Sequence, residues 1–249
     1  MFCFCPRSNI QYLTSGFTMS IYKTDAIILR TIKYGEADKI LTMLSPDGQI
    51  QAIAKGSRRV KSRLGGRLEP FCYVNLVLYK GKNLHTITQA SLIKPHKNIR
   101  EDYSKYVIAF AATELVGKVT FAGQKEEAIF GLLKAMLNYL DSQIRKDELV
   151  LLYFEWQILK ALGFQPHLDT KGRWFNLEEG RLEENPPQDS AFEMDPLTIS
   201  LLKSIIIEGF DKLNELKLEK STLKRFSILT KQYMDLKLQT KIKSRSFVD

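Results

Sequence analysis

The segment of the chain with the clearest chemical character is a run of cations between residues 55 and 67. Six of these thirteen residues are basic and none is acidic, and Gly56, Gly65 and Gly66 allow the backbone to turn. Lysine and arginine bind phosphate oxygens, and arginine can form two such hydrogen bonds at once. The pattern predicts a loop, called here the basic loop, that holds a phosphate backbone without reading bases. The alternative is a solvated loop without a ligand. Its cations are Lys55, Arg58, Arg59, Lys61, Arg63 and Arg67.

The net charge of +9 is unevenly distributed along the chain. Residues 1–100 hold 16 lysines and arginines against five acids, whereas residues 101–249 hold 21 against 23. The first hundred residues therefore carry a net charge of +11 and the remainder −2. A basic region joined to a nearly neutral one indicates a module that binds a polyanion, carried on an interaction scaffold.

Residues that could support catalysis or bind a metal are sparse. The basic loop lacks the Gly-Lys-Ser/Thr ending of a P-loop, and neither GxGxxG nor HExxH occurs. His85, His96 and His167 are far apart in the sequence, and His85 is expected to be structural. Glu36 and Asp38 form a short acidic pair, which we expect to orient the basic loop or cap a turn. We therefore expect no enzyme activity, no catalytic residue, no metal and no cofactor, with a metal-dependent nuclease as the less favoured alternative.

The 249 residues suffice for one or two domains with a substantial core, and no apolar stretch reaches the length of a membrane span. The three cysteines cannot build a disulfide framework. Residues 1–18 lack the pattern of a signal peptide, so we expect an N-terminal extension that is disordered or absent from the native protein, with Met19 as an alternative start. These features predict a cytoplasmic, nucleoid-associated protein without a membrane partner.

The elements that must position the basic loop are short strands. A Pro46-Asp47-Gly48 turn joins two apolar runs, which indicates a hairpin, and residues 71–79 alternate between two faces. The expected strands are residues 21–31, 39–44, 49–54, 71–79 and 84–90. Five short strands without a long helix predict a small closed barrel, of which the OB-fold is the commonest five-stranded form. The basic loop would connect its third and fourth strands.

The remainder of the chain is predicted to be helical. Apolar residues recur at helical spacing, Gly163 is a natural helix end, and Ser221 is the expected N-cap of the last helix. The expected helices are residues 102–121, 126–140, 147–162, 197–208 and 221–238. The fold class is therefore α+β: an OB-fold domain at residues 19–95, then an all-α helical domain at residues 96–249 with an irregular insert at about residues 164–195.

Further residues of the β region could extend the binding surface. Lys80 and Lys82 lie at the expected tip of a hairpin and would continue the path of the phosphates. For the tyrosines of this region, base stacking and packing in the core are equally favoured; they are Tyr34, Tyr73 and Tyr79. Phe71 is expected in the core.

Several motifs in order resemble the RecO family of bacterial recombination mediator proteins. The first is Ala26-Ile27-Ile28-Leu29 followed by residues 34–40 (YGEADKI), and the second is KGSRR with KSR, ending in LEPF at residues 68–71. Leu162-Gly163-Phe164-Gln165-Pro166 and the tail LQTKIKSRSF at residues 238–247 are the others. The four motifs occur in this order and span residues 19–247.

The resemblance implies an N-terminal OB-fold and a helical C-terminal domain, in agreement with the reading of the residues. It also implies a protein of DNA repair and homologous recombination that binds single- and double-stranded DNA and anneals complementary strands. Its partners would be RecR and the acidic C-terminal tail of single-strand-binding protein, and it would help to load recombinase onto strands coated by that protein. An RNA-binding OB-fold module is the main alternative, because charge does not distinguish the two nucleic acids.

The insert departs from the family pattern. Many RecO proteins carry four cysteines there in a zinc finger, but residues 167–192 contain none, and Asp169-Thr170-Lys171-Gly172 stand in place of the first pair. A lone His167 cannot form a tetrahedral zinc site. We therefore predict that the insert binds no zinc and is held by packing through Trp174, Phe175 and Phe192.

Overall fold

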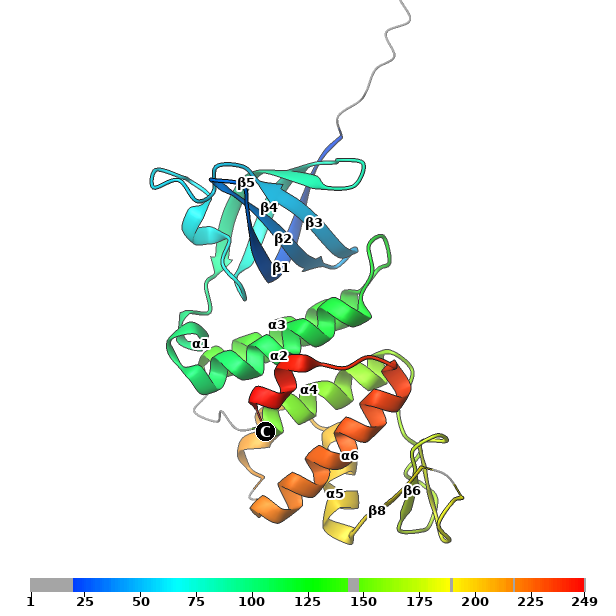
Figure 1. Cartoon of the computed structure of the whole chain (residues 1–249). Helices are drawn as coiled ribbons and strands as arrows, with labels where there is room; N and C mark the ends of the chain where they lie inside the picture. The colour runs from blue at the N-terminus through cyan, green and yellow to red at the C-terminus, as the bar shows by residue number, and fades with distance from the viewer. Residues whose placement is uncertain (1–19, 143–147, 189, 217, 249) are drawn as a thin grey trace, which may run out of the picture.

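A computed structural model describes residues 20–142, 148–188, 190–216 and 218–248. The expected extension at residues 1–18 and the alternative start at Met19 lie outside these residues. Figure 1 shows a β-barrel above a longer helical part, connected by a single crossing of the chain. None of the helices that the structure describes combines the length and the apolar character needed to span a bilayer.

The barrel is closed and has five strands, as the sequence predicts. The strand order is β1-β2-β3-β5-β4, with β4 returning to β1 and only β3 and β5 running parallel. Residues on the inner faces are apolar and fully buried, among them Ile28, Leu41 and Leu76, which is what period-two alternation around a barrel requires. The strands are β1 (Ile21–Tyr34), β2 (Asp38–Ser45), β3 (Gly48–Ala54), β4 (Tyr73–Tyr79) and β5 (His85–Lys94).

The start of the fourth strand is later than predicted. Phe71 was expected within the strand, but its φ is +69° and β4 begins at Tyr73. The backbone of Phe71 instead bonds to Ile28 of β1, and its fully buried ring meets the edge of Tyr106 in the helical part. The expectation that Phe71 belongs to the core is confirmed, while its place in the strand is wrong because the chain bends there to close the barrel.

The helical part is built around one fully apolar helix. α4 buries residues on all sides, including Phe154, Trp156 and Ile158, and a helix that is apolar all round belongs in the interior. α2 begins at the side chain of Asp102, which accepts hydrogen bonds from the backbone of Ser104 and Lys105. The helices are α1 (Lys97–Glu101), α2 (Tyr103–Val119), α3 (Glu127–Ser142), α4 (Glu148–Ala161), α5 (Pro196–Ile207) and α6 (Lys220–Leu238). The described residues also form three short 3₁₀ helices, which are η1 (Gly65–Arg67), η2 (Phe210–Asn214) and η3 (Lys243–Phe247).

Two details of the helices differ from the sequence-based expectation. The five-residue α1 was not predicted, because one turn is too short for a periodic pattern. The N-cap of α6 is Glu219 rather than Ser221, whose hydroxyl bonds to the Glu219 carboxylate. Gly163 follows α4 with a φ of +85°, as expected for a residue that ends a helix.

The insert is not irregular, which corrects the prediction. It forms a three-stranded sheet in the order β7-β6-β8, made of β6 (Trp174–Asn176), β7 (Arg181–Glu183) and β8 (Ala191–Glu193). Strands of three residues are too short to show an alternating pattern in the sequence. Phe175 is fully buried and its ring lies edge-on to Tyr233 of α6, 5.4 Å away between centroids. Aromatic packing therefore attaches this sheet to the helices.

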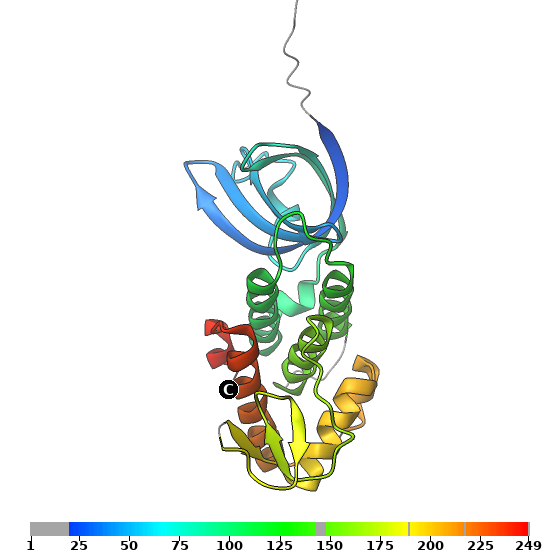
Figure 2. The ribbon, with the colours of Figure 1, turned by 90° about the vertical axis from the view of Figure 1, so that its right-hand side faces the viewer.

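The barrel rests directly on α2 and α3 (Figure 2). The backbone N–H of Gln49 donates to Phe121 at 3.0 Å, and that of Glu126 donates to Pro46 at 2.8 Å. Gly48 has a φ of +109°, and a Cβ there would lie 2.3 Å from the carbonyl oxygen of Gln124. Only glycine fits this turn, so the hairpin between β2 and β3 fixes the barrel on the helices.

Candidate nucleic-acid interface

The basic loop leaves the barrel between β3 and β4 and is anchored at its start. The backbone N–H of Gly56 donates to the carboxylate of Asp38 at 2.7 Å, and that of Arg58 donates to the carbonyl of Ala37 at 2.8 Å. The Arg58 guanidinium also donates to Gly35 at 3.2 Å. The expectation that Asp38 orients the loop is confirmed. Glu36 is exposed and forms no hydrogen bond or ion pair with other described residues.

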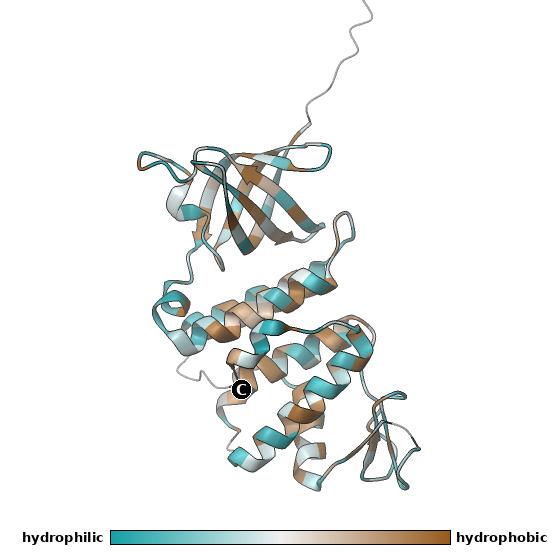
Figure 3. Ribbon diagram, in the orientation of Figure 1, coloured by the Kyte–Doolittle hydropathy of each residue, from teal (hydrophilic) through white to brown (hydrophobic). Residues whose placement is uncertain are grey.

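The far end of the loop is anchored in the barrel itself. Leu68 is fully buried in the barrel core, and Leu64 packs against the same cluster. The Arg67 guanidinium donates to the carbonyl of Ala90 at 2.9 Å. Backbone bonds from Arg59 to Gly56 and from Ser62 to Arg59 make the segment between the anchors a series of turns. The basic loop is thus an ordered projection, seen as a hydrophilic (teal) segment at the upper left of Figure 3.

The cations of the loop face solvent. All six are exposed, and among the residues that the structure describes none of them forms an ion pair with an acid. Glu69, the nearest acid in the sequence, is bound to Lys39 of β2 at 2.8 Å instead. An unpaired group of like charges on an anchored loop favours an anionic partner.

The hairpin between β4 and β5 carries the other two predicted residues. Lys80 and Lys82 are exposed there and also lack ion pairs within the described part of the chain. Gly81 is required in the turn, because a Cβ would lie 1.9 Å from the carbonyl oxygen of Leu84. Figure 1 places this hairpin and the basic loop at the end of the barrel that points away from the helices, on opposite sides. The hairpin and the projecting part of the basic loop thus lie at one end of the barrel, in two separate groups. Arg67 is the exception, because its guanidinium bonds to Ala90, halfway along β5.

The aromatic residues divide by burial. Phe71 and Tyr73 are buried, and the Tyr73 hydroxyl donates to Asp25 at 2.7 Å. Burial, together with this hydrogen bond and the charge of Asp25, raises the pKa of Tyr73 to about 12. Tyr34 is 54% exposed and Tyr79 is 37% exposed. Tyr34 precedes the turn that holds the basic loop, so of the four it is the ring best placed to meet a base beside the loop.

The outer face of β1, β2 and β3 is a feature that the sequence reasoning missed. In the register of the sheet, Arg30 lies opposite Thr42 and Thr42 opposite Gln51. One step nearer to the basic loop, Ile32 lies opposite Ile40, and Ile32 is 45% exposed. The alternation of Arg30, Ile32 and Tyr34 could have revealed this face, since residues two apart share a side of a strand. This outer face carries both polar and apolar side chains, and it extends from the basic loop toward the helices.

Two of the three histidines bond to other parts of the fold through their rings. The Nδ1 atom of His85 lies 3.0 Å from the Tyr22 hydroxyl, and burial and the charge of Lys80 lower the pKa of His85. His96 is fully buried, with its Nδ1 atom 2.8 Å from the carbonyl oxygen of Phe71 and its Nε2 atom 3.1 Å from Asn138. His167 is exposed in the insert. Within the described residues no three histidines, cysteines or acids gather where they could hold a metal.

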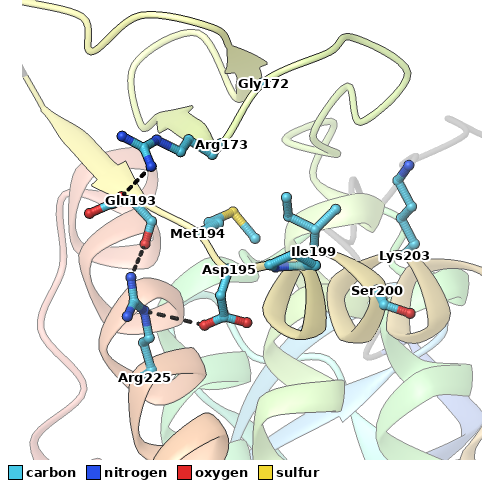
Figure 4. Close-up of a pocket in the computed structure, with 10 residues that line it drawn as sticks. Gly172, Arg173, Glu193, Met194, Asp195, Ile199, Ser200, Lys203 and Arg225 are labelled. Atoms are coloured by element: carbon cyan, nitrogen blue, oxygen red, sulfur yellow. Dashed lines mark hydrogen bonds and ion pairs between the residues drawn. The ribbon is translucent and has the colours of Figure 1, made fainter.

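Another hollow lies between the insert, α5 and α6 (Figure 4). It has a volume of about 810 Å³. Its arginines are matched by acids: Arg173 lies 3.4 Å from Glu193, and Arg225 lies 3.6 Å from Asp195. A hydrogen bond from the backbone N–H of Thr198 is the main cause that lowers the pKa of Asp195, so this acid stays ionised. The hollow offers an anion less uncompensated positive charge than the basic loop does.

Comparison with known proteins covers nearly the whole described chain. A family model described as "Recombination protein O N terminal" matches residues 19–96, and one described as "Recombination protein O C terminal" matches residues 100–246. A protein named "DNA repair protein RecO" from Thermoanaerobacter sp. (strain X514) is 30% identical over 244 residues, which is 93% of this chain and 98% of that protein. The protein of that name from Dehalococcoides mccartyi (strain CBDB1) is 42% identical over 148 residues, covering 59% of this chain and 58% of the relative.

Proposed function

The chain belongs to the RecO family of DNA repair and recombination proteins, and we propose that it acts as a mediator that holds DNA on its basic loop. The observation that supports this most strongly is the anchored loop itself. Six exposed cations, which form no ion pair with any acid in the described part of the chain, belong to a loop of a barrel with OB-fold topology. Lys80 and Lys82 would give a second contact at the same end of the barrel.

Binding would be driven by release of the counterions that surround DNA. A loop that neutralises six phosphates of a single strand gives a slope of log K against log salt concentration of about −4, from roughly −0.7 per phosphate. Because contacts to phosphates carry no sequence information, the affinity would depend little on sequence. Both single- and double-stranded DNA present the phosphates that the loop needs.

Strand annealing follows from the same electrostatics. Two complementary strands repel each other, and cations that neutralise both backbones lower this repulsion. The basic loop and the hairpin at Lys80 and Lys82 lie on opposite sides of one barrel end, which would allow each to hold a strand. Annealing by this route needs no covalent chemistry, so we propose that the protein is not an enzyme.

The partners that we propose follow from membership in the family. We propose RecR and the acidic C-terminal tail of single-strand-binding protein, with the complex helping to load recombinase onto coated strands. The near-neutral helical part would serve as the scaffold for these contacts.

Charge reversal in the loop tests the DNA-binding proposal. The variant with Arg58, Arg59 and Arg63 changed to Glu is expected to lose binding and annealing of labelled oligonucleotides, while its thermal unfolding stays unchanged. A matched control changes Lys171, Lys203 and Lys220, which are exposed cations of the helical part, to Glu, with the same change in net charge. Equal binding by both variants would show that the loop is not the site.

Two further assays separate the remaining alternatives. Competition between single-stranded DNA and RNA of one sequence is expected to favour DNA, and a preference for RNA would support the RNA-binding module instead. Labelled DNA incubated with Mg²⁺ or Mn²⁺ is expected to stay intact, and cleavage that follows the protein through purification would show a nuclease.

A further inference from the structure

A groove of about 450 Å³ lies between the outer face of the barrel, α2 and the C-terminal segment. Arg30, Thr42 and Gln51 line it from three neighbouring strands, so the barrel wall of the groove is the lower part of the β1–β3 face. Phe110 of α2 and Phe247 of η3 line it from the helical side. In Figure 1 the C-terminal segment (red) lies alongside α2, below β1 and β2. The volume is within the range of pockets that hold small ligands, so an unpaired base fits it.

Two aromatic rings of the groove are open to solvent. Phe110 is 37% exposed and Phe247 is 61% exposed. Phe110 is supported from behind, because its ring is stacked on Tyr106 at 6.1 Å between centroids and Tyr106 in turn meets the buried Phe71. Exposed, rigidly held phenyl rings stack well on nucleic-acid bases of any sequence.

The charge of the groove fits an anionic occupant. Its one acid, Glu114, is already engaged by Lys118 at 2.7 Å and by the backbone N–H groups of Lys243 and Ser244. Burial would raise the pKa of Glu114, but the hydrogen bonds from Lys118, Ser244 and Lys243 outweigh it and lower the pKa to about 2. The Glu114–Lys118 pair is therefore neutral overall. The exposed side chains of Arg30 and Lys243 remain as positive charge on the rim.

The C-terminal segment that carries Phe247 is held firmly against the helices. The Ser244 hydroxyl also bonds to Glu114, and the Arg245 guanidinium forms a buried ion pair with Glu155 of α4 at 2.8 Å. Arg245 also donates to Ser227 of α6. Phe247 is thus presented by an anchored segment, in the way that the basic loop is presented by the barrel.

Strand β1 connects this groove to the basic loop. The loop is held at Gly35, just beyond Tyr34, and Arg30 lies four residues before Tyr34 on the same strand. At the rise of a β-strand this is about 13 Å. The exposed side chain of Ile32 lies between Arg30 and the basic loop, so a short apolar surface has cations at both of its ends.

We infer that the groove receives unpaired bases of a single DNA strand whose phosphates are held by the basic loop. The strand would run from the loop along the outer face of β1, pass Arg30, and place bases against Phe110 and Phe247. This inference rests on the proposed function, and it adds the strand's path and a preference for single-stranded DNA. Paired bases inside a duplex cannot reach the rings, so duplex DNA would be held by the loop alone.

The test compares two probes of equal length and charge, oligo(dT) and a strand of abasic deoxyribose phosphates. Changing Phe110 or Phe247 to Ala is expected to weaken binding of oligo(dT) about five- to tenfold each, and to leave binding of the abasic strand and of duplex DNA unchanged. The matched control is Phe121→Ala, since Phe121 is also 61% exposed and does not line the groove. Phe247→Trp is expected to keep the affinity and to show quenching of the new indole when oligo(dT) binds.

The outcomes distinguish this inference from the proposed function. If the wild-type protein fails to bind the abasic strand, the phosphate-binding loop is refuted. If it binds both probes and the double Phe110→Ala, Phe247→Ala variant keeps the wild-type preference for oligo(dT), only the groove is refuted. A double variant that keeps this preference but no longer binds an acidic peptide would assign the groove to a protein partner and overturn the inference. Thermal unfolding of each variant shows that the fold is intact.

Discussion

Removing the carboxylate of Asp38 has two opposite effects on DNA binding, because it removes both an anchor of the basic loop and a negative charge near it. Asp38→Ala removes a negative charge close to the binding site, which by itself should strengthen DNA binding. At about 8–10 Å from a phosphate in water this effect is about 0.5 kcal/mol before screening by salt, or less than about twofold after it. The same change removes the acceptor of the Gly56 N–H, a charge-assisted hydrogen bond of 2.7 Å. Such bonds contribute about 1.5–3 kcal/mol.

The loop keeps its other anchors at Ala37, Gly35 and Ala90 in this variant, so we expect only part of that energy to appear in binding. The prediction is a net loss of about 1 kcal/mol, or about fivefold in affinity. Fluorescence anisotropy with a labelled oligonucleotide at fixed salt measures it.

Glu36→Ala is the matched control, because Glu36 lies in the same turn and is exposed without a partner among the described residues. It removes the same charge but no anchor, and it is expected to strengthen binding by less than about twofold. If Asp38→Ala strengthens binding as Glu36→Ala does, the anchoring of the loop has no part in its function and the reasoning is refuted.

Three further predictions concern the C-terminal segment and the insert. Arg245→Ala is expected to destabilise the fold by about 3–5 kcal/mol in urea unfolding, since it removes one partner of a buried ion pair; a loss below about 1 kcal/mol would contradict this. Because the folded pKa of Glu114 is lowered to about 2, its carboxylate stabilises the fold above pH 4.5 and this contribution is lost as the pH falls toward 2. Glu114→Gln should therefore cost about 1–2 kcal/mol at pH 7, after allowance for partial exposure, and progressively less below pH 4.5; a constant difference would contradict it. Metal analysis of the purified protein is expected to find no zinc, and stoichiometric zinc would overturn the interpretation of the insert.

Much of the barrel could be predicted from the sequence because its signals are local. The Pro46-Asp47-Gly48 turn and the alternation of residues 71–79 each lie within one hairpin or strand. The position of the basic loop between β3 and β4 followed from the same signals. Phe71 shows the limit of such local signals. Its aromatic side chain predicted burial, but its positive φ depends on a backbone hydrogen bond to Ile28, 43 positions away in the chain, which closes the barrel.

The groove lay beyond prediction because three distant segments build it. Arg30, Phe110 and Phe247 each look ordinary in the sequence, and only the docking of the barrel on α2 brings them together. The role of Glu114 is equally hidden, since its partners Lys243 and Ser244 are about 130 residues away. The insert was misjudged for another reason, because strands of three residues carry too little pattern to be seen.

The salt dependence of single-strand binding tests the central claim that the basic loop holds the phosphate backbone. The slope of log K against log salt concentration is measured for the wild type and for the variant with Arg58, Arg59 and Arg63 changed to Ala. We predict a slope less steep by about 2 in the variant, from roughly 0.7 for each of three lost phosphate contacts. Equal slopes in the two proteins would mean that these arginines touch no phosphate, and the account would be wrong.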